Sequence, residues 1–134
     1  MNITSFDDLL KAARLQNEPQ RLLFVFTAAE LSEGASAQQR ARYEAGEGGE
    51  LAPLMCVDKS ADELADFGAL AAQAALAGPP WAIVFAAALS GRGGIMPSSD
   101  QAQAPLQHMV EAIKSGRLDG MLPFDRHGEA VALL

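Results

Sequence analysis

Apolar and polar residues follow two periods along this chain, one typical of helices and one typical of buried strands. The first helix is indicated by apolar residues at i, i+3, i+4 and i+7, namely Phe6, Leu9, Leu10 and Ala13. Thr4 and Ser5 precede this stripe and can cap the helix. Asp7 and Asp8 would lie in its first turn, where the helix dipole favours acids. The pattern therefore predicts a helix that ends before Pro19.

Three short runs predict strands: residues 21–29 (RLLFVFTAA), 51–58 (LAPLMCVD) and 81–89 (WAIVFAAAL). The first and the last are apolar on both alternating faces, which predicts strands covered on both sides of a sheet. Because the last run has no charged residue, we expect it at the centre of the sheet. Pro53 lacks the backbone N–H that a strand ladder uses, so the second run is expected at a sheet edge.

A second helix is predicted after residue 60. Ser60 and Glu63 have the spacing of a capping box, and Gly78 with Pro79 ends the pattern. The apolar face between them consists of Leu64, Phe67, Ala71, Ala74 and Ala75.

A third helix and a hairpin complete the pattern. The third helix carries Leu106, Met109, Val110 and Ile113. We expect Pro105 in its first turn or at a kinked start, because proline disrupts a helix interior. Residues 121–124 and 129–134, joined by the turn Asp-Arg-His-Gly at 125–128, predict a terminal hairpin.

These elements predict a single α/β domain over residues 1–134, bordering on the α+β class. The predicted order is α-β-β-α-β-α-β-β, with about five strands and three main helices. The strand-helix-strand units after residue 51 favour right-handed crossovers between parallel strands, while the terminal hairpin is antiparallel. We therefore expect a mixed sheet. A chain of 134 residues is long enough to bury one core without metals or disulfides.

Residues 32–50 form a long polar connection that contains four glycines. Within it, Ser36 and Gln39 have capping-box spacing, which predicts a short helix ending at Gly46. A connection of this length is unusual in a small domain. We interpret it as an exposed excursion in preference to a lid over a binding site.

Charge and composition exclude several classes of partner. The chain has 10 Lys and Arg against 17 Asp and Glu, a net charge of -7, and its cations are scattered. This disfavours nucleic acid, whose binding needs clustered cations. No run reaches the roughly 18 apolar residues of a membrane span, and the first residues lack the apolar core of a signal peptide. With Cys56 as its single cysteine, the chain is expected to be cytoplasmic, with no nucleic-acid or membrane partner.

The stretch LSGRGGIMPSSD, residues 89–100, is the candidate for ligand chemistry. It lacks the Lys-Ser/Thr pair of a Walker loop and the third glycine of a dinucleotide fingerprint. What remains is a generic anion site, made of flexible backbone amides, a cation and a helix N-terminus. Its candidate residues are Gly91, Arg92, Gly93, Gly94, Ser98 and Ser99. The alternative, an ordinary loop with capping serines, is preferred.

The other reactive side chains form no catalytic or metal-binding pattern. Cys56 lies in an apolar strand pattern, which predicts a buried and inert thiol. His108 and His127 are expected to face solvent. A Ser-His-Asp triad would have to combine a serine of the glycine-rich stretch with His108 and Asp100, without a nucleophile elbow. We therefore expect no catalytic residue, no cofactor and no metal site.

The chain contains the segments LLFVF, LMCVDKSADELADF, WAIVFAAALSGRGG with the later PLQHMVEAI, and LPFDRHGEAV. Together they resemble a family of small uncharacterised bacterial proteins, over nearly the whole chain. Members often carry the label "ribonucleotide reductase subunit alpha", which would imply a thiyl radical on one cysteine and a reducing cysteine pair. Because this chain has one cysteine, we do not expect that activity. The order of elements also resembles the N-terminal domain of SseB-like proteins, which implies a topology and no active residue.

Two functions remain. The first is a non-catalytic interaction or regulatory domain that self-associates as a homodimer or binds a protein partner. The missing catalytic pattern supports it, as does an apolar terminal strand at residues 130–134 whose edge could pair with another chain. The alternative is a protein, or an enzyme, that binds a small anionic ligand or a nucleotide phosphate with the loop at residues 90–100 under a lid formed by residues 32–50.

Overall fold

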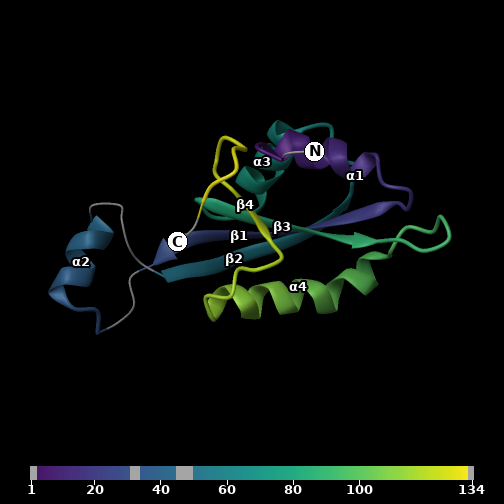
Figure 1. The fold of residues 1–134 in the computed structure, drawn as a ribbon. Coiled ribbons are helices and arrows are strands. Elements are labelled where there is room, and N and C mark those ends of the chain that lie inside the picture. Colours follow the sequence, from purple (N-terminus) through teal and green to yellow (C-terminus); the bar gives the residue numbers. More distant parts are fainter. Residues whose placement is uncertain (1–2, 31–33, 45–49, 133–134) are drawn as a thin grey trace.

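The structure is a computed structural model that describes residues 3–30, 34–44 and 50–132. In these residues, helices and strands alternate and form a single α+β domain (Figure 1). The order is α-β-α-β-α-β-α-β. The elements are α1 (Phe6–Arg14), β1 (Gln20–Glu30), α2 (Ala37–Glu44), β2 (Glu50–Ser60), α3 (Phe67–Ala77), β3 (Ile83–Ser90), α4 (Ser99–Lys114) and β4 (Leu122–Phe124).

The sheet formed by the described strands has the order β2-β1-β3-β4, and every neighbouring pair is antiparallel. The predicted mixed sheet with parallel neighbours is therefore wrong. β2 and β3 do run in the same direction, as the predicted crossover requires. However, β1 lies between them and pairs with both, so the crossover through α3 spans one intervening strand.

The terminal hairpin is smaller than predicted. The turn after β4 forms, with the Asp125 N–H donating to the Glu129 carbonyl at 2.9 Å. The returning segment makes isolated bridges instead of a strand, because the Ala130 N–H donates to the Thr4 carbonyl at 3.0 Å while Ala130 also bridges Phe124. The described part of the sheet therefore has four strands where we expected about five. Residues 133 and 134, at the end of the predicted strand, lie outside the described residues.

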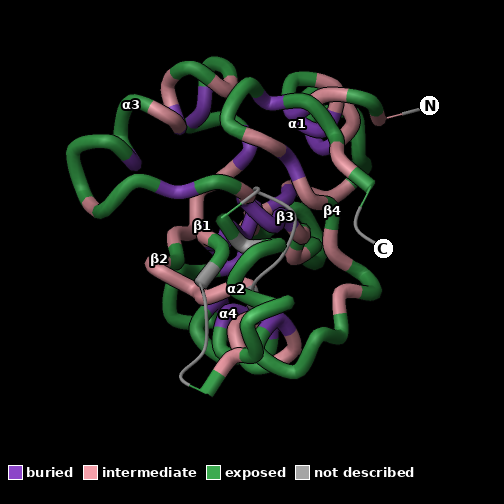
Figure 2. Tube along the Cα trace, turned by 90° about the vertical axis from the view of Figure 1, so that its left-hand side faces the viewer, coloured by how far each residue is buried: buried purple, intermediate pink, exposed green. Residues whose placement is uncertain are grey.

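Helices cover both faces of the sheet, which gives three layers (Figure 1). α1 and α3 lie over an aromatic core, in which the Phe6 ring contacts Phe24 and Phe124 at centroid distances of 5.4 and 5.5 Å. α4 covers a second core on the opposite face, built on Val25 and Phe85. Figure 2 shows the buried residues gathered on the central strands and on the helix sides that face them. β3 is an interior strand, as its lack of charge predicts.

α1 begins where the sequence predicts. The Ser5 hydroxyl caps the helix by accepting from the Asp8 N–H at 3.2 Å, and the predicted apolar stripe is buried. The Asp8 carboxylate in turn accepts from the Thr4 backbone N–H at 3.1 Å and from the Thr4 hydroxyl at 3.0 Å. These bonds stabilise the ionised form and hold the pKa of Asp8 below its ordinary value.

α3 begins later than predicted. Ser60 is still paired within β2, and its N–H donates to the Glu63 carboxylate at 3.0 Å in a turn that precedes the helix. The helix starts at Phe67 because carboxylates hold its first amides. The Asp7 side chain accepts from the Phe67 N–H at 2.9 Å, and the Asp66 side chain accepts from the amide three residues on, also at 2.9 Å.

Pro105 lies inside α4, so the expectation that it marks the helix start is wrong. Ser98 and Gln101 form a capping box ahead of it. The Ser98 N–H donates to the Gln101 side chain at 2.8 Å, and the Gln101 N–H donates to the Ser98 hydroxyl at 3.1 Å. This cap and the burial of Leu106, Met109 and Ile113 hold the helix despite the backbone bond that proline removes.

β2 lies at an edge of the sheet, as Pro53 predicts, and its register with β1 shifts between Phe26 and Thr27. Cys56 is exposed, so the predicted burial of its thiol is wrong. The residue pairs with Val25 on the face that α4 covers. Val25 is buried there, but Cys56 belongs to the outer strand and stays open to solvent.

The long connection contains α2, which begins with the predicted capping box. The Ser36 N–H donates to the Gln39 side chain at 2.8 Å, and the Gln39 N–H donates to the Ser36 hydroxyl at 3.1 Å. Gly46, the predicted end of this helix, lies outside the described residues. Figure 1 shows α2 standing beyond one end of the sheet, which agrees with an exposed excursion.

Candidate functional site

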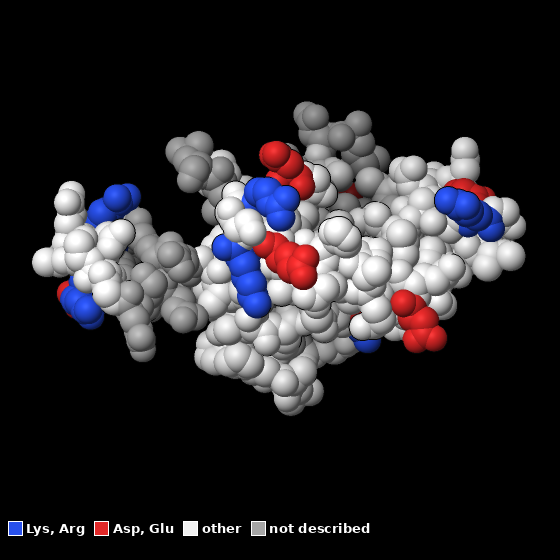
Figure 3. All heavy atoms as spheres, turned by 90° about the horizontal axis from the view of Figure 1, so that it is seen from below, with Lys and Arg blue, Asp and Glu red and all other residues white. Residues whose placement is uncertain are grey.

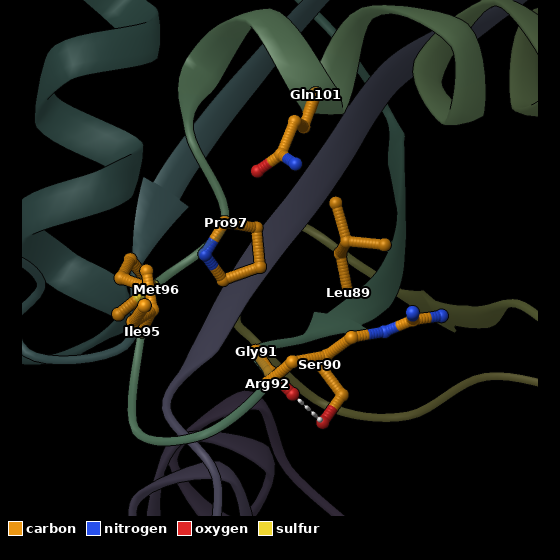
Figure 4. Close-up of a pocket in the computed structure, with 8 residues that line it drawn as sticks. All are labelled: Leu89, Ser90, Gly91, Arg92, Ile95, Met96, Pro97 and Gln101. Carbon is orange, nitrogen blue, oxygen red and sulfur yellow. Dashed lines mark hydrogen bonds between the residues drawn. The ribbon is translucent and has the colours of Figure 1, made fainter.

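The loop between β3 and α4 borders a hollow of about 400 Å³, at the place where the sequence predicts a ligand site (Figure 4). The lining residues are Leu89, Ser90, Gly91, Arg92, Ile95, Met96, Pro97 and Gln101. Of the predicted anion-binding residues, Gly91 and Arg92 line the hollow. Gly93, Gly94 and Ser98 belong to the same loop and Ser99 begins α4, and none of these four residues lines the hollow.

Two of the predicted glycines form a tight turn. The Arg92 N–H donates to the Ile95 carbonyl at 3.2 Å, and the Ile95 N–H donates back to the Arg92 carbonyl at 3.0 Å. Gly93 and Gly94 between them have φ values of 59° and 80°. Two successive residues with positive φ are the signature of a type I′ turn, which favours glycine at both positions. The two glycines are therefore explained by backbone geometry.

Gly91 is required by close packing of the backbone. Its N–H donates to the Pro19 carbonyl at 2.8 Å, so this amide is already bonded. A Cβ atom at this position would lie 2.3 Å from the Ile95 carbonyl oxygen and 3.0 Å from the Pro19 carbonyl oxygen. Neither backbone atom can move away alone, so any side chain here would distort the loop.

Two carboxylates contact the loop at positions where an anion would have to bind. The Gly94 N–H donates to the Glu18 carboxylate at 3.0 Å. The Ser99 hydroxyl donates to the Asp58 carboxylate at 3.0 Å. The chain's own acids thus use donors that the anion-site prediction assigns to a ligand, and their charge opposes a second anion nearby.

Arg21 ties this loop to the sheet. Its Nε donates to the Pro97 carbonyl at 2.6 Å, and its Nη1 forms an ion pair with the Asp58 carboxylate at 2.8 Å. The two side chains are only 15% and 14% exposed. Sequence reasoning missed this arrangement because the residues are far apart in the chain. The register that pairs β1 with both β2 and β3 brings them together.

Arg92, the cation of the predicted anion site, does not point toward the middle of the loop. Figure 4 shows the Arg92 side chain extending away from Ile95 and Met96. Ser98 is occupied as the cap of α4. Anion binding at this loop stays a prediction. The features that still support it are the hollow and the exposed side chain of Arg92.

The connection between β1 and β2, which we interpreted as an exposed excursion in preference to a lid, starts from the end of the sheet opposite this loop. The chain leaves β1 at Glu30 and enters β2 at Glu50, and these two residues pair with each other. The loop at residues 91–98 follows Ser90, which pairs with Gln20 at the opposite end of β1. The paired ends of these strands therefore favour the exposed excursion over the alternative of a lid on the loop.

The side chains considered for catalysis are separated. His108 and His127 are exposed, as expected. His108 lies on α4 eight residues after Asp100, which corresponds to about 12 Å along the helix axis and is too far for a hydrogen bond. Among the described residues, no three His, Cys, Asp or Glu side chains gather in a way that could hold a metal ion. No described helix is both long and apolar enough to cross a membrane.

A second hollow, of about 410 Å³, lies at the C-terminal end of α3 and was not predicted. We call it the Trp81 pocket. Its lining residues are Ala71, Ala75, Gly78, Pro79, Pro80, Trp81 and Arg126. Trp81 is 9% exposed and packs edge-on against Phe26 and Phe67, at centroid distances of 5.0 and 6.3 Å. The signal in the sequence was Gly-Pro-Pro-Trp, which we interpreted as the end of a helix and the start of the next strand.

The outer side of α3 is apolar. Leu70 and Ala74 face the core, and this differs from the predicted stripe, which included the exposed Ala75. The side open to solvent carries Gly68, Ala72, Ala75, Leu76 and Ala77, with Gln73 as the polar residue among them. We call this side the α3 surface. Leu76 is 91% exposed. By contrast, the α4 face carries scattered charges of both signs among uncharged residues (Figure 3).

Comparisons of the chain with protein-family models, with curated proteins and with solved structures find no match. The two resemblances drawn from the sequence therefore stay predictions.

Proposed function

We propose that this chain is a non-catalytic interaction domain that self-associates through the α3 surface. The observation that carries the proposal is the composition of α3. A helix that is apolar around nearly its whole circumference is normally buried, yet this one, with Gln73 as its polar residue, presents Ala72, Ala75 and Leu76 to solvent. Contiguous apolar surface of this kind is typical of protein contacts.

A second copy of the chain fits the α3 surface because the surface is self-complementary. Gly68, Ala72 and Leu76 follow one another at four-residue steps and are all exposed. A two-fold axis beside Ala72 would bring Leu76 of each copy against Gly68 of the other. Apart from the helix backbone, a Cβ atom built on Gly68 would come within 4 Å only of the Asp66 side chain, so space is open above it. Large-on-small contacts of this kind satisfy a symmetric interface.

The charge distribution also favours this surface. No charged residue occurs between Asp66 and Arg92, so two copies can meet on α3 without desolvating a charge on that helix. The net charge of -7 makes two copies repel each other at long range. Salt screens such repulsion over a Debye length of about 8 Å at physiological ionic strength. Self-association should therefore strengthen as salt rises.

Sedimentation equilibrium of the wild type and of Leu76→Gln tests the proposal. We expect a concentration-dependent dimer that tightens with added salt. Leu76→Gln should weaken dimerisation by about tenfold or more, because each of the two copies loses roughly 1 kcal/mol of apolar burial. Thermal unfolding of the diluted monomer should change little, since the side chain is 91% exposed.

Leu15→Gln is the matched control. Leu15 is 71% exposed at the C-terminal cap of α1, outside the α3 surface. It should leave dimerisation unchanged. A wild type that stays monomeric across the concentration range, or equal effects of the two substitutions, would overturn the proposal.

Anion binding at residues 90–100 is the second candidate function. It is supported by the hollow beside the loop and by Arg92, which is exposed and forms no ion pair with another described residue. The occupied amides of Gly91 and Gly94 count against it.

A further inference from the structure

The Trp81 pocket combines an apolar lining with one cation. Six of its seven lining residues are uncharged, and the seventh is Arg126. Arg126 belongs to the turn that follows β4, whereas the rest of the lining comes from α3 and from the segment that leads into β3. The pocket is therefore assembled from parts of the chain that lie about fifty residues apart.

Arg126 forms no ion pair with Asp125, the acid beside it in the sequence. The carboxylate of Asp125 is directed into its own turn, where it accepts from the backbone N–H groups of His127 at 2.8 Å and Glu129 at 3.1 Å. These bonds hold the pKa of Asp125 below its ordinary value. No ion pair joins Arg126 to another described residue. Arg126 therefore places a positive charge beside the apolar lining, where a carboxylate of a ligand can pair with it.

We infer that the Trp81 pocket binds a peptide segment in which an aliphatic side chain is followed directly by a carboxylate side chain. The apolar walls formed by Ala71, Ala75 and Pro80 accept the aliphatic group. Arg126 at the rim pairs with the carboxylate, which orients the segment. The inference rests on the proposed function for the class of ligand, a protein segment, and it assigns a site that shares Ala75 with the α3 surface.

Charge complementarity selects this ligand over others. A basic segment would place its cation next to Arg126 and would be repelled. A wholly apolar segment would fill the pocket but leave the guanidinium without a partner. A volume of about 410 Å³ falls within the size range of small-ligand pockets and can accommodate one or two side chains, but not a folded element.

Trp81 provides the readout, because it is the single tryptophan of the chain and it lines the pocket. The probes are two blocked peptides, acetyl-Gly-Gly-Leu-Glu-amide and acetyl-Gly-Gly-Leu-Gln-amide, titrated while tryptophan fluorescence is followed. We expect a saturable change with both peptides and tighter binding of the Leu-Glu peptide. Arg126→Gln should weaken the Leu-Glu peptide about threefold to fivefold, the range for a largely exposed ion pair, and leave the Leu-Gln peptide unchanged.

Lys114→Gln is the control for the loss of one positive charge, since Lys114 is exposed at the end of α4, outside the pocket. It should affect neither peptide. Ala71→Leu should weaken both peptides by filling the pocket, and circular dichroism would verify its fold. The titrations are repeated on Leu76→Gln, which alters the α3 surface and no lining residue, so a failure of self-association leaves this test intact. Equal affinity for the two peptides in every variant, or no saturable change at millimolar peptide, would refute the inference.

Discussion

The glycine-rich loop and the α3 surface differ in which groups remain free to bind a partner. The loop has the more suggestive sequence, but its polar groups are bonded within the chain: the amide of Gly91 to Pro19, the amide of Gly94 to Glu18 and the hydroxyl of Ser99 to Asp58. The α3 surface has an unremarkable alanine-rich sequence, but its apolar residues face solvent without a covering element among the described residues.

This difference shows why a sequence motif is a weaker guide to binding than the presence of groups that have no partner within the folded chain. A bonded amide must give up one partner to gain another, so the net gain from a ligand is small. An exposed apolar group gains roughly 25 cal/mol for each Å² that a partner covers. The binding proposals of this structure therefore rest on α3 and its neighbouring pocket, and the loop is explained first as a tightly built connection.

Replacing Arg21 tests most strongly whether the loop is a structural connection. Arg21→Met removes the bond to the Pro97 carbonyl and leaves Asp58 without its ion-pair partner in a mostly buried site. We expect a loss of about 2–3 kcal/mol in the free energy of unfolding, measured by urea denaturation. Arg117→Met, at an exposed position, should cost less than about 0.5 kcal/mol. Similar losses for both variants would mean that Arg21 does not anchor the loop.

Two glycine substitutions separate close packing from backbone conformation. Gly91→Ala places a methyl group against backbone oxygens, so we expect a loss of about 1–3 kcal/mol. Gly93→Ala has open space but a φ of 59°, and should cost about 1 kcal/mol. Gly93→Asn should be milder, because asparagine tolerates positive φ. Urea denaturation of the three variants checks this order, and a Gly91→Ala variant as stable as the wild type would contradict the close packing.

The smallest expected effect concerns anions at the loop. We expect phosphate at low salt to leave the amide resonances of Gly91 and Gly94 unshifted in the wild type, because both N–H groups are bonded. Glu18→Ala frees the Gly94 amide and removes a negative charge, so a weak, salt-sensitive shift should appear there. In the Glu18→Ala background, Arg92→Ala should abolish that shift. Wild-type shifts confined to the loop and lost in Arg92→Ala would instead favour the anion-binding function.

Local signals in the sequence predicted the secondary structure well. The structure contains the predicted helix stripe of Phe6 and Leu10 and the capping box of Ser36. It also has β2 at a sheet edge, as Pro53 predicts. Each depends on residues that are neighbours in the chain, so spacing alone carries the information. α3 shows the limit of such signals, because its start depends partly on Asp7, sixty residues away.

Pairing between distant strands could not be predicted from the sequence. A strand-helix-strand order gives the direction of β2 and β3, but it does not tell which strand lies between them. Because strand pairing was unknown, we did not predict that Arg21 and Asp58 lie together beside the loop. For the same reason we expected Cys56 to be buried. The Trp81 pocket was missed for a related reason, because Arg126 reaches it from the far end of the chain.

The place of β1 between β2 and β3 has a consequence for how the chain is made. β1 pairs with β2, 20 to 39 residues later in the chain, but its other edge pairs with β3, up to 70 residues later. During synthesis, the run Leu22–Phe26 therefore waits with one edge open after its first partner has formed. Short, uncharged segments rich in β-formers are prone to aggregate in that state. Arg21, which anchors the folded loop, lies directly before the run, and a charge that flanks such a segment opposes its aggregation.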